Sequence, residues 1–179
     1  MTRRRPWRRV ADALYWVGVV ALVVFAVRRF VPDLRLPDLG PAPDVTVLAL
    51  DGTPHSPADY RGRVVVLNVW ATWCPPCVVE TPGFVDLAAE FGDDVQFLGR
   101  SQDENTADVQ AFARRHDVPY PLLVGRPVGG AEPPTTVLPT TFVIDRRGRV
   151  RMRHEGLLLE PALRAALRRL AAEPPPQAP

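Results

Sequence analysis

Two mostly apolar runs mark the middle of the chain, at Val64–Val69 and Val95–Gly99, and the first of them is rich in β-branched valine. Such runs are typical of strands that are buried on both faces of a sheet. Between them, apolar residues recur at helical spacing from Phe84 to Phe91, and Gly92 follows at a position suited to end a helix. A strand, a helix and a second strand joined by short links predict a right-handed parallel βαβ unit.

Shorter patterns complete the predicted sheet. Val45–Leu50 alternates as a strand does, whereas Thr141–Ile144 and Arg149–Arg153 flank a turn and predict an antiparallel hairpin whose three arginines face outward. Helices are predicted over Thr106–Arg115 and from Pro161 onward. The predicted fold class is therefore α/β, with a mixed central sheet flanked by helices on both faces.

The N-terminal region differs from the rest of the chain in hydropathy. An apolar run over 10–27, interrupted only by Asp12, has five arginines before it and two after it. Eighteen helical residues span about 27 Å, enough for a thin hydrocarbon core. The arginine excess before the run predicts a cytoplasmic N-terminus and an exported body. A cleavable signal peptide is the alternative, but its nearest cleavage sequence, Val24-Phe25-Ala26, lacks a small first residue.

The chain organisation follows from these segments. Residues 32–43 hold four prolines and one glycine, a composition typical of a stiff, extended tether. We therefore predict a cytoplasmic basic segment (1–9), a transmembrane anchor (10–27), a proline-rich tether (28–43), a folded domain (44–173) and a disordered tail (174–179).

The charge of the chain is divided unevenly between the N-terminal region and the body. All 22 basic residues are arginine, and the formal net charge is +2. Residues 1–29 carry seven arginines and one aspartate (+6), whereas the remaining 150 residues carry fifteen arginines and nineteen acidic residues (−4). A protein that binds nucleic acid is expected to carry its positive charge on the folded domain. The negative charge of the body therefore argues against a nucleic-acid partner.

The two cysteines, Cys74 and Cys77, lie where the first buried strand gives way to the helix. Cys74 falls at the helix N-terminus, where unpaired N–H groups and the helix dipole favour the thiolate, the form that attacks disulfides. Cys77 lies one turn inside and can resolve a mixed disulfide by attacking Cys74. Pro75 and Pro76 suit a first turn that needs no N–H donors. The pair predicts disulfide exchange, because a structural disulfide across two residues would gain little entropy.

A metal site is an alternative use of the two thiols. A structural zinc ion takes about four ligands, and the chain offers His55, His116 and His154 besides the cysteines. These histidines fall at a predicted turn, a helix end and an exposed hairpin strand, with no ligand spacing among them. We therefore predict no metal ligands and no cofactor other than a redox-active disulfide between Cys74 and Cys77.

Two sequence stretches carry a resemblance to a known family. Residues 68–77 read NVWATWCPPC and are followed by Glu80 and Pro82, and residues 138–145 read LPTTFVID. With the Leu50-Asp51-Gly52 and Asp59-Tyr60-Arg61-Gly62 stretches, they resemble the TlpA/ResA-like branch of the thioredoxin superfamily. That branch comprises membrane-anchored, extracytoplasmic thiol–disulfide oxidoreductases similar to the AhpC/TSA redoxins. The resemblance covers residues 44–172 and implies a thioredoxin-like fold.

The resemblance implies a role for each residue of the site. Cys74 would be the attacking thiol and Cys77 the resolving thiol, and Pro139 would be the cis-proline that faces the pair and presents backbone to the substrate. Glu80 would lie near the pair, where a carboxylate can exchange a proton with Cys77 or tune its pKa. The alternative for Glu80 is a solvent-facing acid that only complements the helix dipole. The other predicted substrate contacts are Trp73, Pro75, Pro76 and Leu138.

Three features depart from the family pattern. Gly125–Val137 replaces the short helix usually found before the cis-proline, and its three prolines and three glycines exclude a regular helix. Arg100 ends the second buried strand where an apolar or small residue is usual, and we expect its guanidinium to reach solvent along the apolar stem. Thr140-Thr141 replaces the Pro-Glu of some cytochrome-maturation relatives, which argues against that subgroup. Of the two tryptophans near the pair, Trp70 is expected to pack in the core and Trp73 to border the site.

These patterns predict a membrane-tethered thiol–disulfide oxidoreductase on the extracytoplasmic, periplasmic side of the cell membrane. Acting as a reductant, it would serve client proteins with cysteine pairs, such as apocytochrome c or copper-site proteins, and take electrons from a membrane thiol transporter. The N-terminal helix would contact the lipid bilayer. Two alternatives use the same pair: an oxidant that forms disulfides, since direction depends on the stability of the reduced form, and a carrier that holds copper or zinc.

Overall fold

The computed structural model describes residues 15–22, 36–133 and 135–174, and the chain divides into two compact units, Met1–Arg35 and Leu36–Pro179. In the first unit, residues 15–22 form a helix whose side chains are mostly exposed. Among the described residues, no helix combines the length and the hydropathy that a membrane span requires. The predicted basic segment, the rest of the predicted anchor, residues 28–35 of the tether and residues 175–179 of the tail lie outside the described residues.

The second unit is built on a mixed sheet of seven strands in the order β2-β1-β5-β4-β3-β6-β7. Strands β3, β4 and β5 run parallel, and every other pairing in the sheet is antiparallel. The fold class predicted from the sequence, α/β with a mixed sheet, is therefore confirmed. The strands are β1 (Val45–Ala49), β2 (Pro54–His55), β3 (Val64–Trp70), β4 (Val95–Ser101), β5 (Leu122–Gly130), β6 (Thr140–Ile144) and β7 (Val150–Glu155).

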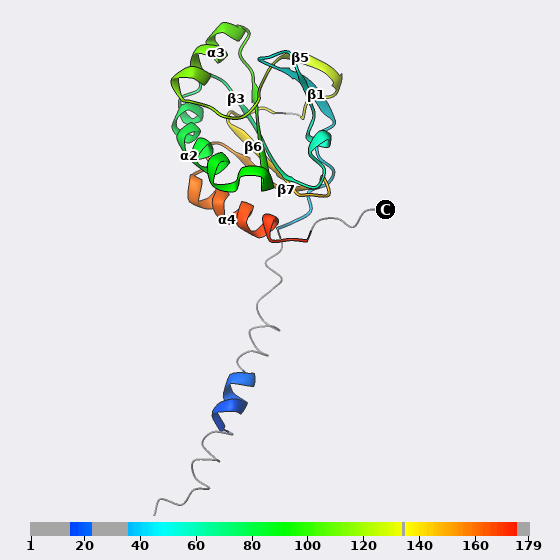
Figure 1. Ribbon diagram of the computed structural model, residues 1–179, viewed down its shortest axis with the longest axis vertical. Coiled ribbons are helices and arrows are strands. Elements are labelled where there is room, and N and C mark those ends of the chain that lie inside the picture. Colours follow the sequence, from blue (N-terminus) through cyan, green and yellow to red (C-terminus); the bar gives the residue numbers. More distant parts are fainter. Residues whose placement is uncertain (1–14, 23–35, 134, 175–179) are drawn as a thin grey trace, which may run out of the picture. The chain divides into compact units, whose positions relative to one another are not determined.

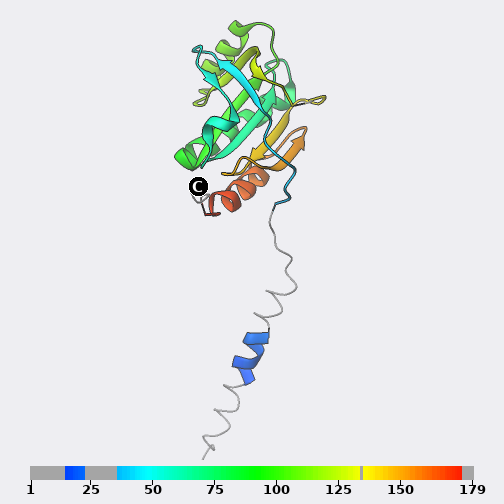
Figure 2. The ribbon, with the colours of Figure 1, turned by 90° about the vertical axis from the view of Figure 1, so that its right-hand side faces the viewer.

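The three α-helices described for this unit, α2 (Pro75–Phe91), α3 (Thr106–Arg115) and α4 (Glu160–Ala171), lie on one face of the sheet (Figures 1 and 2). The steps from β3 to β4 and from β4 to β5 proceed in the same direction across the sheet, and right-handed crossovers then place α2 and α3 on the same side. Among the described residues, the opposite face is covered by the short 3-10 helix η1 (Pro57–Tyr60) and by residues near Ala42 and Leu138. Helices thus flank both faces, as predicted, but very unequally.

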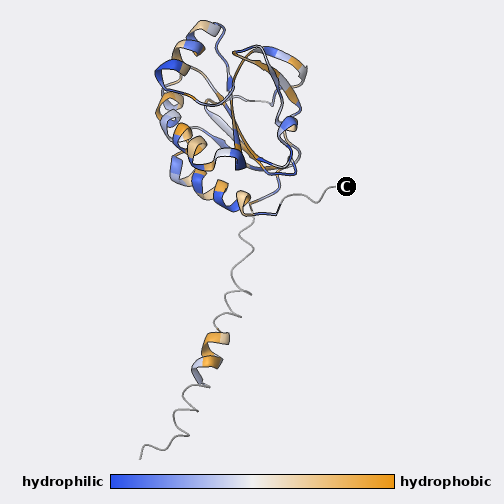
Figure 3. Ribbon diagram, viewed as in Figure 1, coloured by the Kyte–Doolittle hydropathy of each residue, from blue (hydrophilic) through white to orange (hydrophobic). Residues whose placement is uncertain are grey.

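Strand β3 divides the apolar core between these two faces. Val64 and Val66 pack in one buried cluster with Leu87 of α2 and Leu163 of α4. The side chains of Val65, Leu67 and Val69 point to the other face of the sheet and join a second cluster there. All seven residues of β3 are buried, which explains why its sequence is almost continuously apolar rather than alternating. Helix α4 differs from β3 in this respect, because hydrophobic and hydrophilic residues alternate along its ribbon (Figure 3).

Strand β5 was not predicted, although the sequence correctly excluded a helix from its second half. Its pairing with β1 shifts register between Thr46 and Leu48, and this irregularity accommodates Pro127. Gly130 ends the strand with a φ of +69°, and a Cβ atom there would lie 1.9 Å from the carbonyl oxygen of Asp44. The glycine that weakened the strand signal in the sequence is thus required by the close approach of the β1 backbone.

The last residues of the predicted tether belong to the folded unit, which begins at Leu36 rather than at Asp44. Leu39 N–H donates to Val150 O (2.8 Å) and Val150 N–H donates to Gly40 O (2.9 Å), so this segment covers the edge of β7. The predicted outward direction of Arg151 is wrong, because its side chain is only 12% exposed. Its guanidinium pairs with Asp145 (2.9 Å) and donates to Leu36 O (2.6 Å), which joins the segment to the hairpin.

A chain that begins at Asp44 should therefore be less stable than one that begins at Leu36. The shorter chain loses the backbone bonds to β7 and the Asp38–Arg149 ion pair, and it exposes an unpaired strand edge. We expect the free energy of unfolding to fall by about 2–4 kcal/mol, as measured by urea denaturation of the two chains at one pH. Equal midpoints and slopes would show that residues 36–43 add nothing to the fold.

Candidate functional site

The cysteine pair occupies the start of α2. Cys74 is the N-cap residue, with an extended backbone (φ −93°, ψ 106°), and Pro75 and Pro76 fill the first two helical positions, where no N–H donor is needed. A disulfide joins Cys74 to Cys77, and their Cα atoms are 5.3 Å apart. Both residues are almost wholly buried, and Cys77 packs in the apolar cluster beneath α2 and α3. The pair thus lies at the helix position that the sequence predicts.

A surface hollow of about 530 Å³ opens beside the pair, and Cys74 lines it whereas Cys77 does not. The sequence-predicted residues Trp73, Pro75, Pro76 and Leu138 all line this hollow together with Thr136. Trp73 is 67% exposed, so a large indole is available at the rim. Trp70, by contrast, is buried against Phe112 with ring centroids 4.6 Å apart, as expected from the sequence. The hollow therefore combines one sulfur atom with an apolar wall.

The opposite wall of the hollow is the loop that leads into β6. The Leu138–Pro139 peptide bond is cis, as predicted from the family motif. Thr140 Oγ1 donates to Val137 O (2.7 Å), and Gly156 N–H donates to Pro139 O (2.8 Å), so the loop is fixed from both sides. The structure thus brings the two motifs at 68–77 and 138–145 together at one site.

Glu80 is buried directly behind the pair, one helical turn after Cys77, and only 5% of it is exposed. Its carboxylate accepts hydrogen bonds from Asn68 Nδ2 (2.9 Å) and from Leu158 N–H (3.1 Å). Asn68 also donates to Thr141 Oγ1 (3.1 Å), so the network joins α2 to β3, to β6 and to the loop before α4. The solvent-facing alternative for Glu80 is therefore wrong.

Burial raises the pKa of Glu80 from 4.5 to about 7, although both hydrogen bonds act to lower it. Desolvation of the carboxylate thus outweighs its two donors. The pKa of Tyr120 is raised as well, first by burial and then by the nearby charge of Glu80. A carboxyl group with a pKa near neutrality can both accept and release a proton under physiological conditions.

The raised pKa of Glu80 predicts a pH-dependent stability. The folded protein holds this proton until the pH reaches about 7, whereas the unfolded chain releases it near 4.5, so stability falls as the pH rises between these values. Comparing wild type with Glu80→Gln by denaturant unfolding should show a relative loss of about 3 kcal/mol in wild type from pH 4 to pH 8.5. A constant difference between the two proteins over this range would contradict the assigned pKa.

Asp103, a residue that supports the segment before the pair, was not predicted from the sequence. Its carboxylate accepts from Thr72 N–H (3.0 Å) and from Thr72 Oγ1 (2.5 Å), and also from Ser101 Oγ (2.7 Å). Thr72 directly precedes Trp73 and Cys74, so this network fixes the chain where it enters the site. The only signal in the sequence is a polar Ser-Gln-Asp stretch after a buried strand, and it does not specify a partner 31 residues away.

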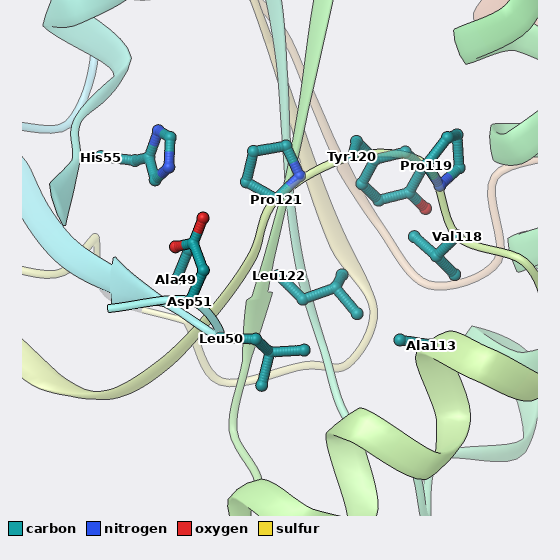
Figure 4. Close-up of a pocket in the computed structure, with 10 residues that line it drawn as sticks. All are labelled: Ala49, Leu50, Asp51, His55, Ala113, Val118, Pro119, Tyr120, Pro121 and Leu122. Carbon is teal, nitrogen blue, oxygen red and sulfur yellow. The ribbon is translucent and has the colours of Figure 1, made fainter. Parts of the chain in front are cut away.

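A second hollow of about 290 Å³ lies between the end of β1 and α3 (Figure 4). Asp51 and His55 lie at one end of it, and Tyr120 and Val118 at the other. His55 bonds to Thr53 Oγ1 (2.9 Å), which donates to Asp51 (2.6 Å), and these bonds hold the turn between β1 and β2. The hydrogen bonds from Thr53 keep the pKa of Asp51 below its ordinary value, so this end carries a negative charge at neutral pH.

The three histidines of the zinc alternative are spread over the fold. His55 lies in β2, His116 follows α3 and packs against the ring of Phe112, and His154 lies in β7 with its Nε2 near Leu157 O (3.1 Å). Within residues 15–22, 36–133 and 135–174, no three histidine, cysteine or acidic side chains come together as a metal-binding group.

Known proteins resemble this chain in both sequence and fold. The AhpC/TSA family matches residues 40–153. The thioredoxin-like protein YneN of Bacillus subtilis is 32% identical over 120 residues, which cover 65% of this chain and 71% of that protein. The thiol-disulfide oxidoreductase ResA of Geobacillus thermodenitrificans is 36% identical over 116 residues, which cover 62% of this chain and 64% of ResA. A thiol:disulfide interchange protein of the thioredoxin family from Chlorobium tepidum superimposes with a TM-score of 0.62 at 25% identity, covering 76% of this chain and all of that one.

Proposed function

This chain belongs to the AhpC/TSA family and is a thiol–disulfide oxidoreductase with a thioredoxin-like fold, and we propose that it reduces disulfides of client proteins outside the cytoplasm. The observation that carries the proposal is the placement of Cys74 and Cys77. One cysteine caps α2 and borders an open hollow, and the other is buried one turn inside the same helix. This arrangement suits one thiol for attack on a client and the second for its release.

In the first step, the Cys74 thiolate of the reduced protein attacks one sulfur of the client disulfide. A mixed disulfide forms, and the other client sulfur leaves as a thiolate. Pro75 and Pro76 have no N–H, so the first backbone donor of the helix that Cys74 can use is Cys77 N–H, which in the disulfide form bonds to Cys74 O (3.1 Å). This donor and the helix dipole stabilise the attacking thiolate.

In the second step, Cys77 loses its proton and attacks the Cys74 sulfur. The mixed disulfide breaks, the client leaves with both cysteines reduced, and the Cys74–Cys77 disulfide seen in the structure forms. The two electrons that reduce the client thus come from the dithiol. Glu80 lies three residues after Cys77 on the same helix, and its pKa of about 7 suits it to accept the Cys77 proton.

The hollow would hold the client chain around its disulfide. Trp73 and Leu138 supply apolar contact area, and the cis-Pro139 loop presents its backbone opposite the sulfur of Cys74. Attack needs the client sulfur aligned with Cys74, so a fixed wall favours the reaction by holding the client in position.

We assign the protein a membrane-tethered location with the folded unit on the extracytoplasmic side, on the basis of the apolar run and its flanking arginines. A membrane thiol transporter would supply the electrons, and apocytochrome c or copper-site proteins are the proposed clients. Carbonate washing of membranes tests the anchor: retention of the full-length chain supports it, and release contradicts it.

Electron transfer to a model client tests the function itself. Pre-reduced protein is mixed with an equal amount of a synthetic peptide that carries a Cys-x-x-Cys disulfide, and free thiols are alkylated and counted by mass spectrometry. The proposal predicts that the peptide becomes reduced while Cys74 and Cys77 become oxidised. Transfer only in the opposite direction, from reduced peptide to oxidised protein, would indicate an oxidant. Tight binding of Cu(I) to the reduced pair without electron transfer would indicate a metal carrier.

A further inference from the structure

Arg100 is a buried cation on the face of the sheet that lacks α-helices. In the sheet it lies beside Val69 of β3 and Leu123 of β5, and both belong to the apolar cluster on that face. The prediction that its guanidinium reaches solvent is wrong, because only 9% of the side chain is exposed. A charge buried at this depth is costly unless it is paired and hydrogen-bonded.

The partner of Arg100 is Glu132, in the segment that replaces the family's short helix. Arg100 Nε donates to Glu132 Oε1 (2.5 Å), and one terminal nitrogen contacts the same carboxylate while the other donates to Ser101 O. The Glu132 side chain is itself only 32% exposed. The ion pair therefore joins the centre of the sheet to a segment without helix or strand in its described residues after Gly130.

This segment leads directly into the wall of the active-site hollow. Ala131 N–H donates to Asp44 O (2.7 Å), and Glu132 is the next residue, so the start of the segment is attached to the residue before β1 and to β4. Pro133 comes next, and its ring fixes φ. Thr136 and Leu138, at the end of the segment, line the hollow opposite Cys74.

We infer that the Arg100–Glu132 pair positions the client-contacting wall of the hollow and thereby determines which disulfides the protein accepts. The inference rests on the proposed function, since it concerns the same hollow and the same reaction. A polypeptide client touches Thr136 and Leu138 as well as Cys74, so its binding depends on where the wall lies. A small disulfide needs only the Cys74 sulfur, so it should be insensitive to the pair.

Glu132→Gln tests this role, because it removes the charge and keeps the size of the side chain. Pre-reduced full-length protein in detergent is mixed with increasing amounts of the Cys-x-x-Cys peptide disulfide or of dithiobis(nitrobenzoate), and the single-turnover rates are fitted to a half-saturating concentration and a maximum rate. For the peptide, we expect the half-saturating concentration to rise about tenfold with little change in the maximum rate. For the small disulfide, the rate should stay within about twofold of wild type.

Glu90→Gln is the matched control. Glu90 is as exposed as Glu132 (34% of the side chain) and also pairs with arginine, through Arg164 (2.7 Å) and Arg168 (3.0 Å), but it lies at the far end of α2 from Cys74. This control should leave both substrates unaffected. A second variant, Arg100→Met with Glu132→Leu, replaces the ion pair by apolar side chains and keeps the test decisive if the single change lowers stability. The double variant should show the same rise in the half-saturating concentration for the peptide and no change in the rate with the small disulfide.

Equal losses with both substrates, or no loss with either, would overturn the inference. Amide hydrogen exchange at residues 136–138 gives a readout that does not depend on activity. Faster exchange in Glu132→Gln than in wild type, with unchanged exchange in β3, supports the positioning role, and unchanged exchange at 136–138 contradicts it. If the wild-type protein reduces neither substrate, the proposed function is wrong, and the exchange measurement alone decides the role of the pair.

Discussion

Replacing Cys74 by serine should lower the rate of client-disulfide reduction by at least about 10³-fold. The reaction begins with attack by a thiolate, and a serine hydroxyl at the same helix N-terminus stays protonated and cannot form a disulfide. The remaining thiol of Cys77 is buried and does not line the hollow, so it cannot substitute. The single-turnover rate of the pre-reduced variant with the peptide disulfide measures the effect.

Wild type in the same reduced state is the control, because neither protein then contains the Cys74–Cys77 disulfide and a difference in cross-linking cannot explain the result. Thermal unfolding of both reduced proteins verifies that the variant is folded. A Cys74→Ser variant that keeps its rate within about tenfold of wild type would show that the attacking group lies elsewhere.

Cys77→Ser should have the opposite phenotype and accumulate a covalent complex with the client. Cys74 can still attack, but no second thiol remains next to it to release the client. In the wild type, the resolving thiol lies one helical turn away, so release is intramolecular and benefits from a high effective concentration. We expect the lifetime of the mixed disulfide to increase by at least about 10²-fold.

Mass spectrometry of the quenched, non-reduced reaction measures this lifetime and identifies the linked residue. The predicted adduct joins the peptide to Cys74 and disappears on treatment with a reducing agent. Cys74→Ser under the same conditions should give almost no adduct. Adducts of similar amount in the two variants would contradict the division between an attacking and a resolving thiol.

The elements nearest the cysteine pair were predictable from the sequence because each has a strong local cause. The apolar run of β3 reflects a strand that is buried along its whole length, and the Cys-Pro-Pro-Cys stretch marks a first helical turn that needs no N–H donors. Pro139 followed from the family motif, and its cis bond is confirmed. In these cases, a residue and its neighbours in the sequence are enough to predict the local structure.

The features that escaped prediction depend on partners far away in the chain. Strand β5 contains glycines and a proline that argue against a strand, and its pairing with β1 is what stabilises it. The depth of Glu80 depends on Leu158 and Asn68, and Asp103 bonds to Thr72 from the loop that follows β4. No periodicity in the sequence encodes such contacts, since they arise only when the sheet brings these segments together.

The reduction potential of the Cys74–Cys77 pair tests the central claim most directly. Protein consisting of residues 36–179 is equilibrated in dithiothreitol and glutathione buffers of known potential, and the reduced fraction is counted by alkylation and mass spectrometry. A reductant of client disulfides should have a potential at or below about −230 mV, toward the value of thioredoxin near −270 mV. A potential near about −120 mV, typical of strong disulfide-forming oxidants, would contradict the claim that this pair works as a reductant.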